Sequence, residues 1–165
     1  MDLPVRKPNR LKDYDYSQNG AYFITICVKD KKEIFWDVGA CIARSNNHPK
    51  LSKYGNVIEN AIKNIPLRYP MISVDKYVIM PNHIHLILII NNNYNGRAMH
   101  APTISTVVNQ MKGFVTKQIG FSIWQKLFYD HIIRNEQEYL KIWQYVDTNA
   151  SKWREDCFYN KQIKL

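Results

Sequence analysis

The chain has 165 residues, enough for one domain with a substantial buried core. Its composition, 45% hydrophobic and 22% charged, is that of a globular protein and excludes wholesale disorder. The 23 basic side chains outnumber the 14 acidic ones, and the resulting net charge of +9 favours an anionic partner, most simply nucleic acid.

Several classes of protein are excluded by what the sequence lacks. The aliphatic run at 86–90 is far shorter than the roughly 20 residues of a membrane-spanning helix. The N-terminal residues 1–8 are polar and do not form the apolar stretch of a signal peptide. The cysteines contain no CxxC pair, which argues against a disulfide framework and a zinc ribbon; they are Cys27, Cys41 and Cys157. We therefore expect a reducing cytoplasm.

The first third of the chain begins with a basic arm at 1–13. Its cations are Arg6, Lys7, Arg10 and Lys12, and either a solvated terminus or a nucleic-acid contact would explain them. After a turn at Asn19-Gly20, the aromatic and β-branched residues of 21–28 predict a strand. Short strands are expected at 34–36 and 40–43.

The middle of the chain predicts one helix and a hairpin. Apolar residues recur three and four apart in 51–65, with Ser52 as the cap and with Pro66 and Pro70 ending the helix. The segments 72–80 and 83–90 predict two strands, because a Pro-Asn turn separates them. A polar loop follows at 91–103.

The last third is expected to be mainly helical. The spacing predicts a helix over 104–119 that Gly120 stops, a short extended piece at 131–133, and a final helix over 136–149. Helices that cannot all cross over between parallel strands imply an antiparallel sheet with helices packed on it. The sequence therefore predicts one α+β domain over 1–165.

The hairpin carries the most informative pattern, His83-Ile84-His85. Residues two apart on a strand share a face, so both imidazoles point the same way, with their Cα atoms about 6 to 7 Å apart, and could converge on one cation. The other face of this strand is wholly apolar. Two structural histidines near a strand end explain the pair equally well, and the pattern alone leaves both interpretations open.

Other metal chemistries can be tested by their missing motifs. The sequence has no His-Glu-x-x-His of a zinc protease and no His-x-Glu with Pro-Cys-x-x-Cys of a zinc deaminase. A site of three alternating histidines would need one at position 87, which is isoleucine. What remains is a two-histidine site that needs a ligand from elsewhere in the chain.

The final predicted helix could supply that ligand. Tyr145 and Asn149 are four residues apart and share a helix face, with Lys141 one turn before and Lys152 one turn after. An oxygen ligand, a phenol and two ammonium groups suit a phosphodiester. From the residues alone, however, a packing tyrosine and a helix cap are the simpler interpretation. The core-facing stripe is expected to be Tyr139, Leu140, Trp143 and Val146.

Four ordered motifs resemble those of the REP-associated tyrosine transposases, which belong to the single-tyrosine HUH transposases of bacterial insertion sequences. The matching segments are 10–27 (RLKDYDYSQNGAYFITIC), 77–85 (YVIMPNHIH), 124–135 (WQKLFYDHIIRN) and 145–149 (YVDTN). The resemblance covers most of the chain. It implies a ferredoxin-like antiparallel sheet flanked by helices.

The resemblance also implies a function and a set of site residues. The family acts on single-stranded DNA: His83, His85 and Asn149 match ligands of Mg²⁺ or Mn²⁺, and Tyr145 matches the nucleophile. Attack on the scissile phosphate would give a 5′-phosphotyrosine and a free 3′-OH that can drive strand transfer without ATP. The substrate would be a hairpin-forming single strand. Relatives include homodimers and monomers, so the oligomeric state stays open.

The sequence departs from the family pattern after Asn149, and the role of one further residue of the shared motifs is open. The family's Asn-Pro is here Asn149-Ala150, so the helix could run on and aim the amide differently. His131 lies in the shared Tyr129-Asp130-His131 motif. Its role is open between structural packing and a position beside DNA or metal. The rival functions are a non-catalytic nucleic-acid binder and a metal phosphodiesterase that uses water.

Overall fold

A single antiparallel sheet forms the centre of the protein, which is described by a computed structural model over residues 13–37, 50–93 and 102–159. The strand order is β2-β3-β1-β4. The strands are β1 (Gly20–Cys27), β2 (Ile72–Ile79), β3 (His83–Ile90) and β4 (Tyr129–Ile133). The basic arm and the strand expected at 40–43 lie outside the described residues.

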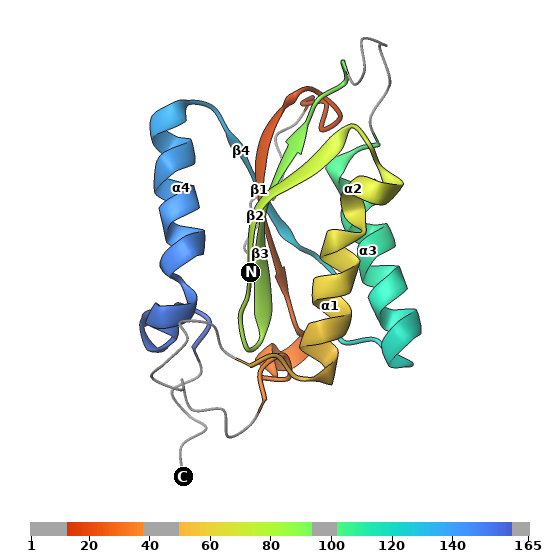
Figure 1. Cartoon of the computed structure of the whole chain (residues 1–165), viewed down its shortest axis with the longest axis vertical. Coiled ribbons are helices and arrows are strands. Elements are labelled where there is room, and N and C mark those ends of the chain that lie inside the picture. Colours follow the sequence, from red (N-terminus) through yellow and green to blue (C-terminus); the bar gives the residue numbers. More distant parts are fainter. Residues whose placement is uncertain (1–12, 38–49, 94–101, 160–165) are drawn as a thin grey trace, which may run out of the picture.

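The helices divide between the two faces of the sheet (Figure 1). On one side lie α1 (Lys53–Lys63), α2 (Ile65–Arg68) and α3 (Ile104–Ile119), and on the other lies α4 (Glu136–Thr148). The chain order β1-α1/α2-β2-β3-α3-β4 with this strand order is the ferredoxin-like arrangement. The predicted α+β ferredoxin-like class is therefore confirmed.

The main core lies between the sheet and the α1–α3 layer. In β1 every second side chain, from Tyr22 to Ile24 and Ile26, is fully buried on this side, as the alternation of a strand requires. The helices contribute apolar residues three and four apart to the same core, such as Ile58 and Ile62 of α1. This layer fixes the sheet, and so fixes the opposite face on which the histidines lie.

A smaller cluster attaches α4 to the opposite face of the sheet. Val146 is buried against Ile87 and Ile133, and Tyr139, Ile142 and Trp143 pack around them. The expected inward stripe was wrong at Leu140, which is 58% exposed. The i, i+3, i+4, i+7 series that starts at Tyr139 runs through Ile142 instead, and Leu140 lies beside that stripe.

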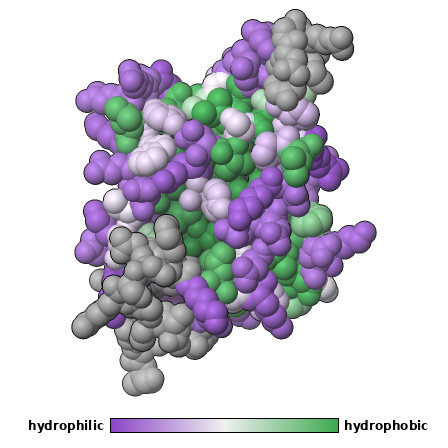
Figure 2. All heavy atoms as spheres, in the orientation of Figure 1, coloured by the Kyte–Doolittle hydropathy of each residue, from purple (hydrophilic) through white to green (hydrophobic). Residues whose placement is uncertain are grey.

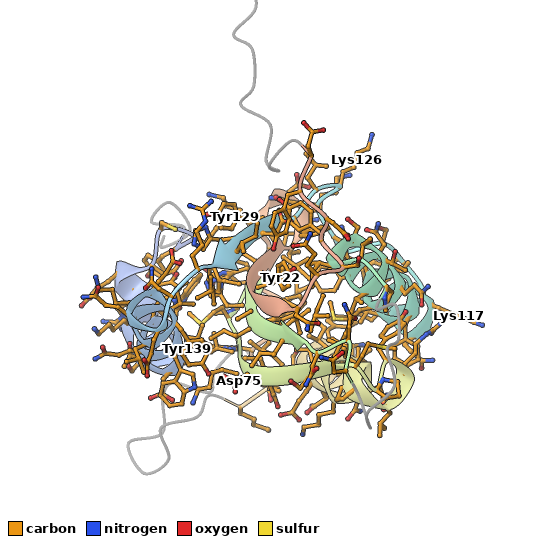
Figure 3. All side chains as sticks on the ribbon, turned by 90° about the horizontal axis from the view of Figure 1, so that it is seen from above. Tyr22, Asp75, Lys117, Lys126, Tyr129 and Tyr139 are labelled. Atoms are coloured by element: carbon orange, nitrogen blue, oxygen red, sulfur yellow. The ribbon has the colours of Figure 1, made fainter. Side chains whose placement is uncertain are left out.

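Polar contacts fasten the same helix to β2. Lys76 pairs with Asp147 at 2.5 Å, and its ammonium lies 3.9 Å from the centre of the Trp143 ring. Tyr139 donates to Asp75, and Figure 3 shows these two residues side by side at the edge of the sheet. Figure 2 shows mainly hydrophilic side chains over the outer side of α4. The helix therefore presents its polar side to solvent and its apolar side to the sheet.

Local signals at the helix ends were read correctly with one exception. The Ser52 side chain accepts from the Gly55 amide as a cap, and Gly120 ends α3 with a φ of +92°. Pro66 does not end a helix but lies in the first turn of α2, where its missing N–H costs nothing.

Outside these helices, the expected strand at 34–36 is reduced to one isolated bridge between Trp36 and Leu51. A 3-10 turn, Lys29–Lys31, follows β1 instead. In the described ranges, every helix is too short or too polar to cross a membrane.

Candidate active site

His83 and His85 lie on the face of β3 that α4 covers, as the strand pattern predicted. Their Nε2 atoms are 3.0 Å apart, and both side chains are buried. The Nδ1 atom of His83 is 2.8 Å from the Asn82 Oδ1, and that of His85 is 2.8 Å from the Thr25 hydroxyl. The Nδ1 contacts therefore fix the orientation of both rings, and the two Nε2 atoms face each other.

The hydrogen bonds and burial together keep these imidazoles available as ligands. The Asn82 amide nitrogen donates to two backbone carbonyls, so its oxygen must accept from the Nδ1–H of His83. This leaves an unprotonated Nε2 on His83. Burial, with the positive charge of Lys31 as a smaller cause, lowers the pKa of His83 to about 3. Burial and the neighbouring His83 lower the pKa of His85 to about 3 as well, so both rings are neutral at pH 7.

Tyr145 reaches this pair from α4, across a separation of 60 residues. Its hydroxyl is 3.2 Å from the Nε2 of His85, and its ring meets Phe23 edge to face with centroids 6.1 Å apart. The side chain is 41% exposed, so a substrate can approach it. Burial, followed by the negative charge of Asp156, raises the pKa of Tyr145 to about 12. The phenol is thus protonated at neutral pH and needs help to act as a nucleophile.

Asp156 completes a group of side chains that could hold a metal ion, and sequence reasoning missed it. After α4 the chain turns through a 3-10 helix, η3 (Ala150–Glu155), and brings the Asp156 Oδ2 to 3.9 Å from the His83 Nε2. The same oxygen accepts from the Tyr145 hydroxyl at 3.5 Å, and the Phe158 amide holds the other oxygen at 2.7 Å. One ligand atom from each of His83, His85 and Asp156 lies within 4.8 Å of the others.

Asn149 lies at the end of α4, next to this group. It is the residue that follows the last helical one, and the chain tightens into η3 there instead of continuing as an α-helix. The residue is 4% exposed, and its Oδ1 has no hydrogen-bond partner among the described residues. An orphaned buried oxygen is costly unless something binds it. Two neutral imidazoles, a carboxylate and this amide oxygen fit a divalent cation.

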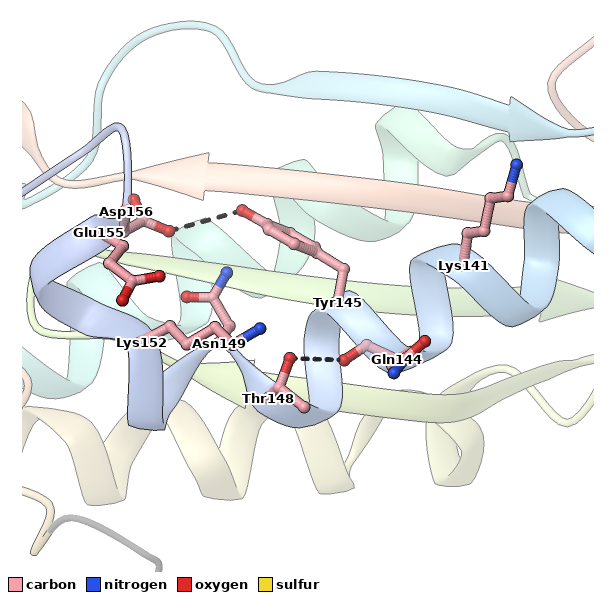
Figure 4. Close-up of a pocket in the computed structure, with 8 residues that line it drawn as sticks. All are labelled: Lys141, Gln144, Tyr145, Thr148, Asn149, Lys152, Glu155 and Asp156. Atoms are coloured by element: carbon pink, nitrogen blue, oxygen red, sulfur yellow. Dashed lines mark hydrogen bonds between the residues drawn. The ribbon is translucent and has the colours of Figure 1, made fainter.

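A cleft of about 480 Å³ opens along α4 beside these residues (Figure 4). Its walls carry both lysines that the helix spacing had grouped with the tyrosine. The lining residues are Lys141, Gln144, Tyr145, Thr148, Asn149, Lys152, Glu155 and Asp156. The structure therefore brings together the phenol, the amide and the two ammonium groups in one cleft.

His131 lies outside the histidine–aspartate group. Its Nε2 is 2.7 Å from the Glu138 Oε1, and the other oxygen of Glu138 accepts from the Arg134 amide. This contact links β4 to the first turn of α4. Among the described residues His131 is therefore not part of the group that could hold a metal ion, and its contact ties two elements of the fold together.

Comparison with known proteins was made on sequence and on structure. No family profile matches the chain. An uncharacterized protein of Haemophilus influenzae is 35% identical over 173 aligned residues, covering 93% of each chain. A second protein of that organism, provisionally named a REP-associated tyrosine transposase, is 24% identical over 146 residues, covering 84% of this chain and 74% of its own.

Two solved structures share the fold. One is a REP-associated tyrosine transposase bound to a REP hairpin, with a TM-score of 0.59 and 20% identity over 87% of this chain and 74% of that one. The other, from Deinococcus radiodurans, is provisionally assigned as a transposase, with a TM-score of 0.50 and 14% identity over 84% and 97% of the two chains.

The fold is that of the solved REP-associated tyrosine transposase, and the predicted resemblance to the REP-associated tyrosine transposases is confirmed. The chain belongs to one family with the uncharacterized Haemophilus protein, which it matches over nearly its whole length.

Proposed function

We propose that the protein is a metal-dependent transposase that nicks single-stranded DNA and transfers the strand. The observation that carries the proposal is the 3.2 Å approach of the Tyr145 hydroxyl to the His85 imidazole, from an element 60 residues away. The net charge of +9 suits a nucleic acid, and the solved relative is bound to a REP hairpin. A hairpin-forming single strand is therefore the proposed substrate.

The proposed reaction exchanges one phosphodiester bond for another. The Tyr145 oxygen attacks the scissile phosphorus and loses its proton, while the bond from phosphorus to the 3′ oxygen breaks and that oxygen gains a proton. The products are a 5′-phosphotyrosine and a free 3′-OH, and the reverse attack by another 3′-OH completes strand transfer. Bond energy is conserved in the linkage, so no nucleotide cofactor is needed.

Each residue of the cleft has a proposed part in this step. His83, His85 and Asn149 would hold Mg²⁺ or Mn²⁺, with the Asp156 carboxylate beside them. A bound divalent cation would polarise the phosphate and offset the charge that develops on it. The cations Lys141 and Lys152 line the same cleft and would neutralise the DNA backbone. The phenol and both imidazoles lie together within one chain, which supports an active site formed in cis.

The decisive experiment looks for a covalent protein–DNA adduct. Labelled hairpin DNA is incubated with Mn²⁺ or Mg²⁺ and resolved on a denaturing gel. Tyr145→Phe should abolish the adduct, and Tyr139→Phe, on the same helix, should keep it. An adduct that survives in Tyr145→Phe would refute the assigned nucleophile. Cleavage with no adduct would show a water-using phosphodiesterase, and a mobility shift without cleavage would show a binder.

The histidines separate metal chemistry from DNA binding. His83→Ala or His85→Ala should remove metal-dependent cleavage while DNA affinity stays largely intact, because the rings lie under the surface that DNA would contact. His131→Ala is the control for the metal alone: that ring pairs with Glu138 outside the group, so the metal dependence of cleavage should not change. Equal loss of cleavage and binding would show that the pair holds the fold instead.

The basic arm gives a separate test of DNA binding. Replacing its four cations should weaken binding and flatten its dependence on salt, as expected when phosphate contacts are lost; they are Arg6, Lys7, Arg10 and Lys12. An unchanged salt slope would exclude the arm as a contact.

A further inference from the structure

The face of the sheet that carries the histidines is covered unevenly. Helix α4 packs against β2 and β3, and it is fastened to the β2 edge through Tyr139 and Asp75. Figure 3 shows Tyr129 on β4, toward the edge of the sheet opposite Asp75. The helix therefore covers the β2 and β3 side of this face more than the β1 and β4 side, where its contacts are those of Val146 with Ile133, Tyr145 with Phe23 and Glu138 with His131.

Strand register places specific side chains on that part of the face. Thr25 of β1 is paired with His85 on one side and with Tyr129 on the other, so the three side chains form a row across the sheet. The next row on the same face is Ile87, Phe23 and His131. Adjacent strands are about 4.8 Å apart, so Tyr129 lies about 10 Å from the histidine pair.

Aromatic rings bridge this interval. Phe23 stacks on the His85 ring with centroids 5.2 Å apart and an interplanar angle of 25°. The same ring meets Tyr145 edge to face. On the edge strand β4, Tyr129 is 50% exposed. By strand register, His131 and Tyr129 of β4 follow on the same face, between Phe23 and the rim of the sheet.

Charge complements the rings. Lys141 and Tyr145 extend from the same side of α4, toward the edge where β1 and β4 lie (Figure 4). The tie between His131 and Glu138 holds the second row in place. An exposed ring, Tyr129, next to the partly buried rings of Phe23 and His131 and beside a cation, is a combination that single-stranded nucleic acids bind, with bases stacked on rings and phosphates beside the cation.

We propose that Phe23, His131 and Tyr129 form a stacking shelf for the bases of the single strand next to the phosphate that Tyr145 attacks. The inference rests on the proposed function and names the contact surface of that same site. At ~3.4 Å of rise per stacked nucleotide, the 10 Å interval corresponds to about three nucleotides or fewer. Tyr129 is the outermost ring and acts by positioning the strand.

The test compares DNA with and without bases. Binding of the full chain is measured in EDTA by fluorescence anisotropy, with a thymidine oligonucleotide of about 20 nucleotides and an abasic strand of equal length. Tyr129→Ala should weaken binding to the thymidine strand by about 10-fold and leave binding to the abasic strand unchanged. Tyr129→Phe should keep the affinity, because the ring remains. Phe121→Ala is the control, since that ring is 52% exposed and packs against Tyr54 of α1.

The outcomes separate the shelf from the enzyme. Equal binding of Tyr129→Ala and the natural protein to the thymidine strand would overturn the shelf, and so would an equal loss on both strands. A loss in Phe121→Ala as large as that in Tyr129→Ala would overturn it too. If Tyr145 forms the adduct but Tyr129→Ala binds normally, the proposed function stands and the shelf fails. If the base-dependent loss appears with no adduct in any metal, the shelf stands and the enzyme fails.

Discussion

The Asp156→Asn variant tests the metal group more sharply than removal of a histidine. The substitution keeps the size of the side chain and its place on the 3-10 turn, but removes the only formal negative charge of the His83–His85–Asp156 group. In the natural protein the Asp156 Oδ2 lies 3.9 Å from one imidazole nitrogen and 3.5 Å from the Tyr145 hydroxyl. We therefore expect two effects, on the cation and on the phenol.

The size of the first effect follows from the place of this carboxylate. Groups that only orient metal ligands change affinity by about 10- to 100-fold when removed. The Asp156 oxygen is charged and lies within 4.8 Å of a ligand nitrogen of each imidazole, so its removal should weaken metal binding at least as much. We expect the Mn²⁺ affinity to fall by 10-fold or more, or ~1.4 kcal/mol. Unit charges about 4 Å apart near a protein surface interact by ~4 kcal/mol, which leaves room for a loss of this size.

The second effect has the opposite direction. The charge of Asp156 is the second cause, after burial, of the raised pKa of Tyr145. Removing that charge should bring the pKa of the phenol down from about 12 toward its ordinary value of 10. Weaker metal binding with an easier phenol ionisation is a pair of changes that simple misfolding would not produce.

Calorimetric titration of the full chain with Mn²⁺, without DNA, measures the first effect, and an ultraviolet pH titration of the phenolate measures the second. Glu155→Gln is the matched control: it removes a neighbouring carboxylate that lines the same cleft but is not part of the group. An unchanged Mn²⁺ affinity in Asp156→Asn, together with its loss in His83→Ala, would show that the carboxylate is not a ligand and would refute the argument.

Three further predictions concern stability. Gly55→Ala should cost about 1–3 kcal/mol in a urea titration, because a Cβ there would lie 2.3 Å from a carbonyl oxygen; Gly113→Ala, with open space around it, should not destabilise. Val146→Ala should lower the thermal midpoint and slow adduct formation, since it removes ~2 kcal/mol of buried contact from the helix that carries the phenol. His83 and His85 have folded pKa values of about 3, well below the unfolded value of 6.5. As the pH falls, the unfolded chain therefore takes up protons before the folded chain does. Urea titrations in the presence of EDTA should show that the free energy of unfolding falls as the pH drops from 6.5 toward 3, and a flat profile would contradict this.

The fold was readable from the sequence because local and long-range patterns agree. The helix predicted over 104–119 is α3 with the same bounds, since its capping glycine and apolar spacing point to one answer. The hairpin of β2 and β3 was predicted because its two strand patterns and the Pro-Asn turn between them also agree. The expected strand at 34–36 failed because its apolar residues, such as Phe35, are buried in an irregular segment against the end of α1, where pairing is limited to one bridge.

The sequence predicted the site only where residue spacing along one strand or helix determines which way side chains point. Alternation on β3 put both imidazoles on one face, and the i, i+4 relation put the phenol and the amide on one side of α4. No period in the sequence could relate the strand to the helix, because the 3.2 Å contact between them depends on how α4 lies across the sheet. Asp156 was missed for a similar reason: a carboxylate in a segment without periodicity carries no directional signal.

The departure at Asn149-Ala150 is explained by that same segment. A proline after the asparagine would end the helix by removing an N–H, and its absence raised the expectation that the helix could run on. The chain instead tightens from Asn149 into the 3-10 helix η3, whose Lys152 amide donates to the Asn149 carbonyl at 3.0 Å. The tighter turn ends at Asp156, where the Phe158 amide fixes the carboxylate toward the imidazoles. The same turn buries the Asn149 amide oxygen, which has no hydrogen-bond partner among the described residues, in the wall of the cleft that Asp156 also lines.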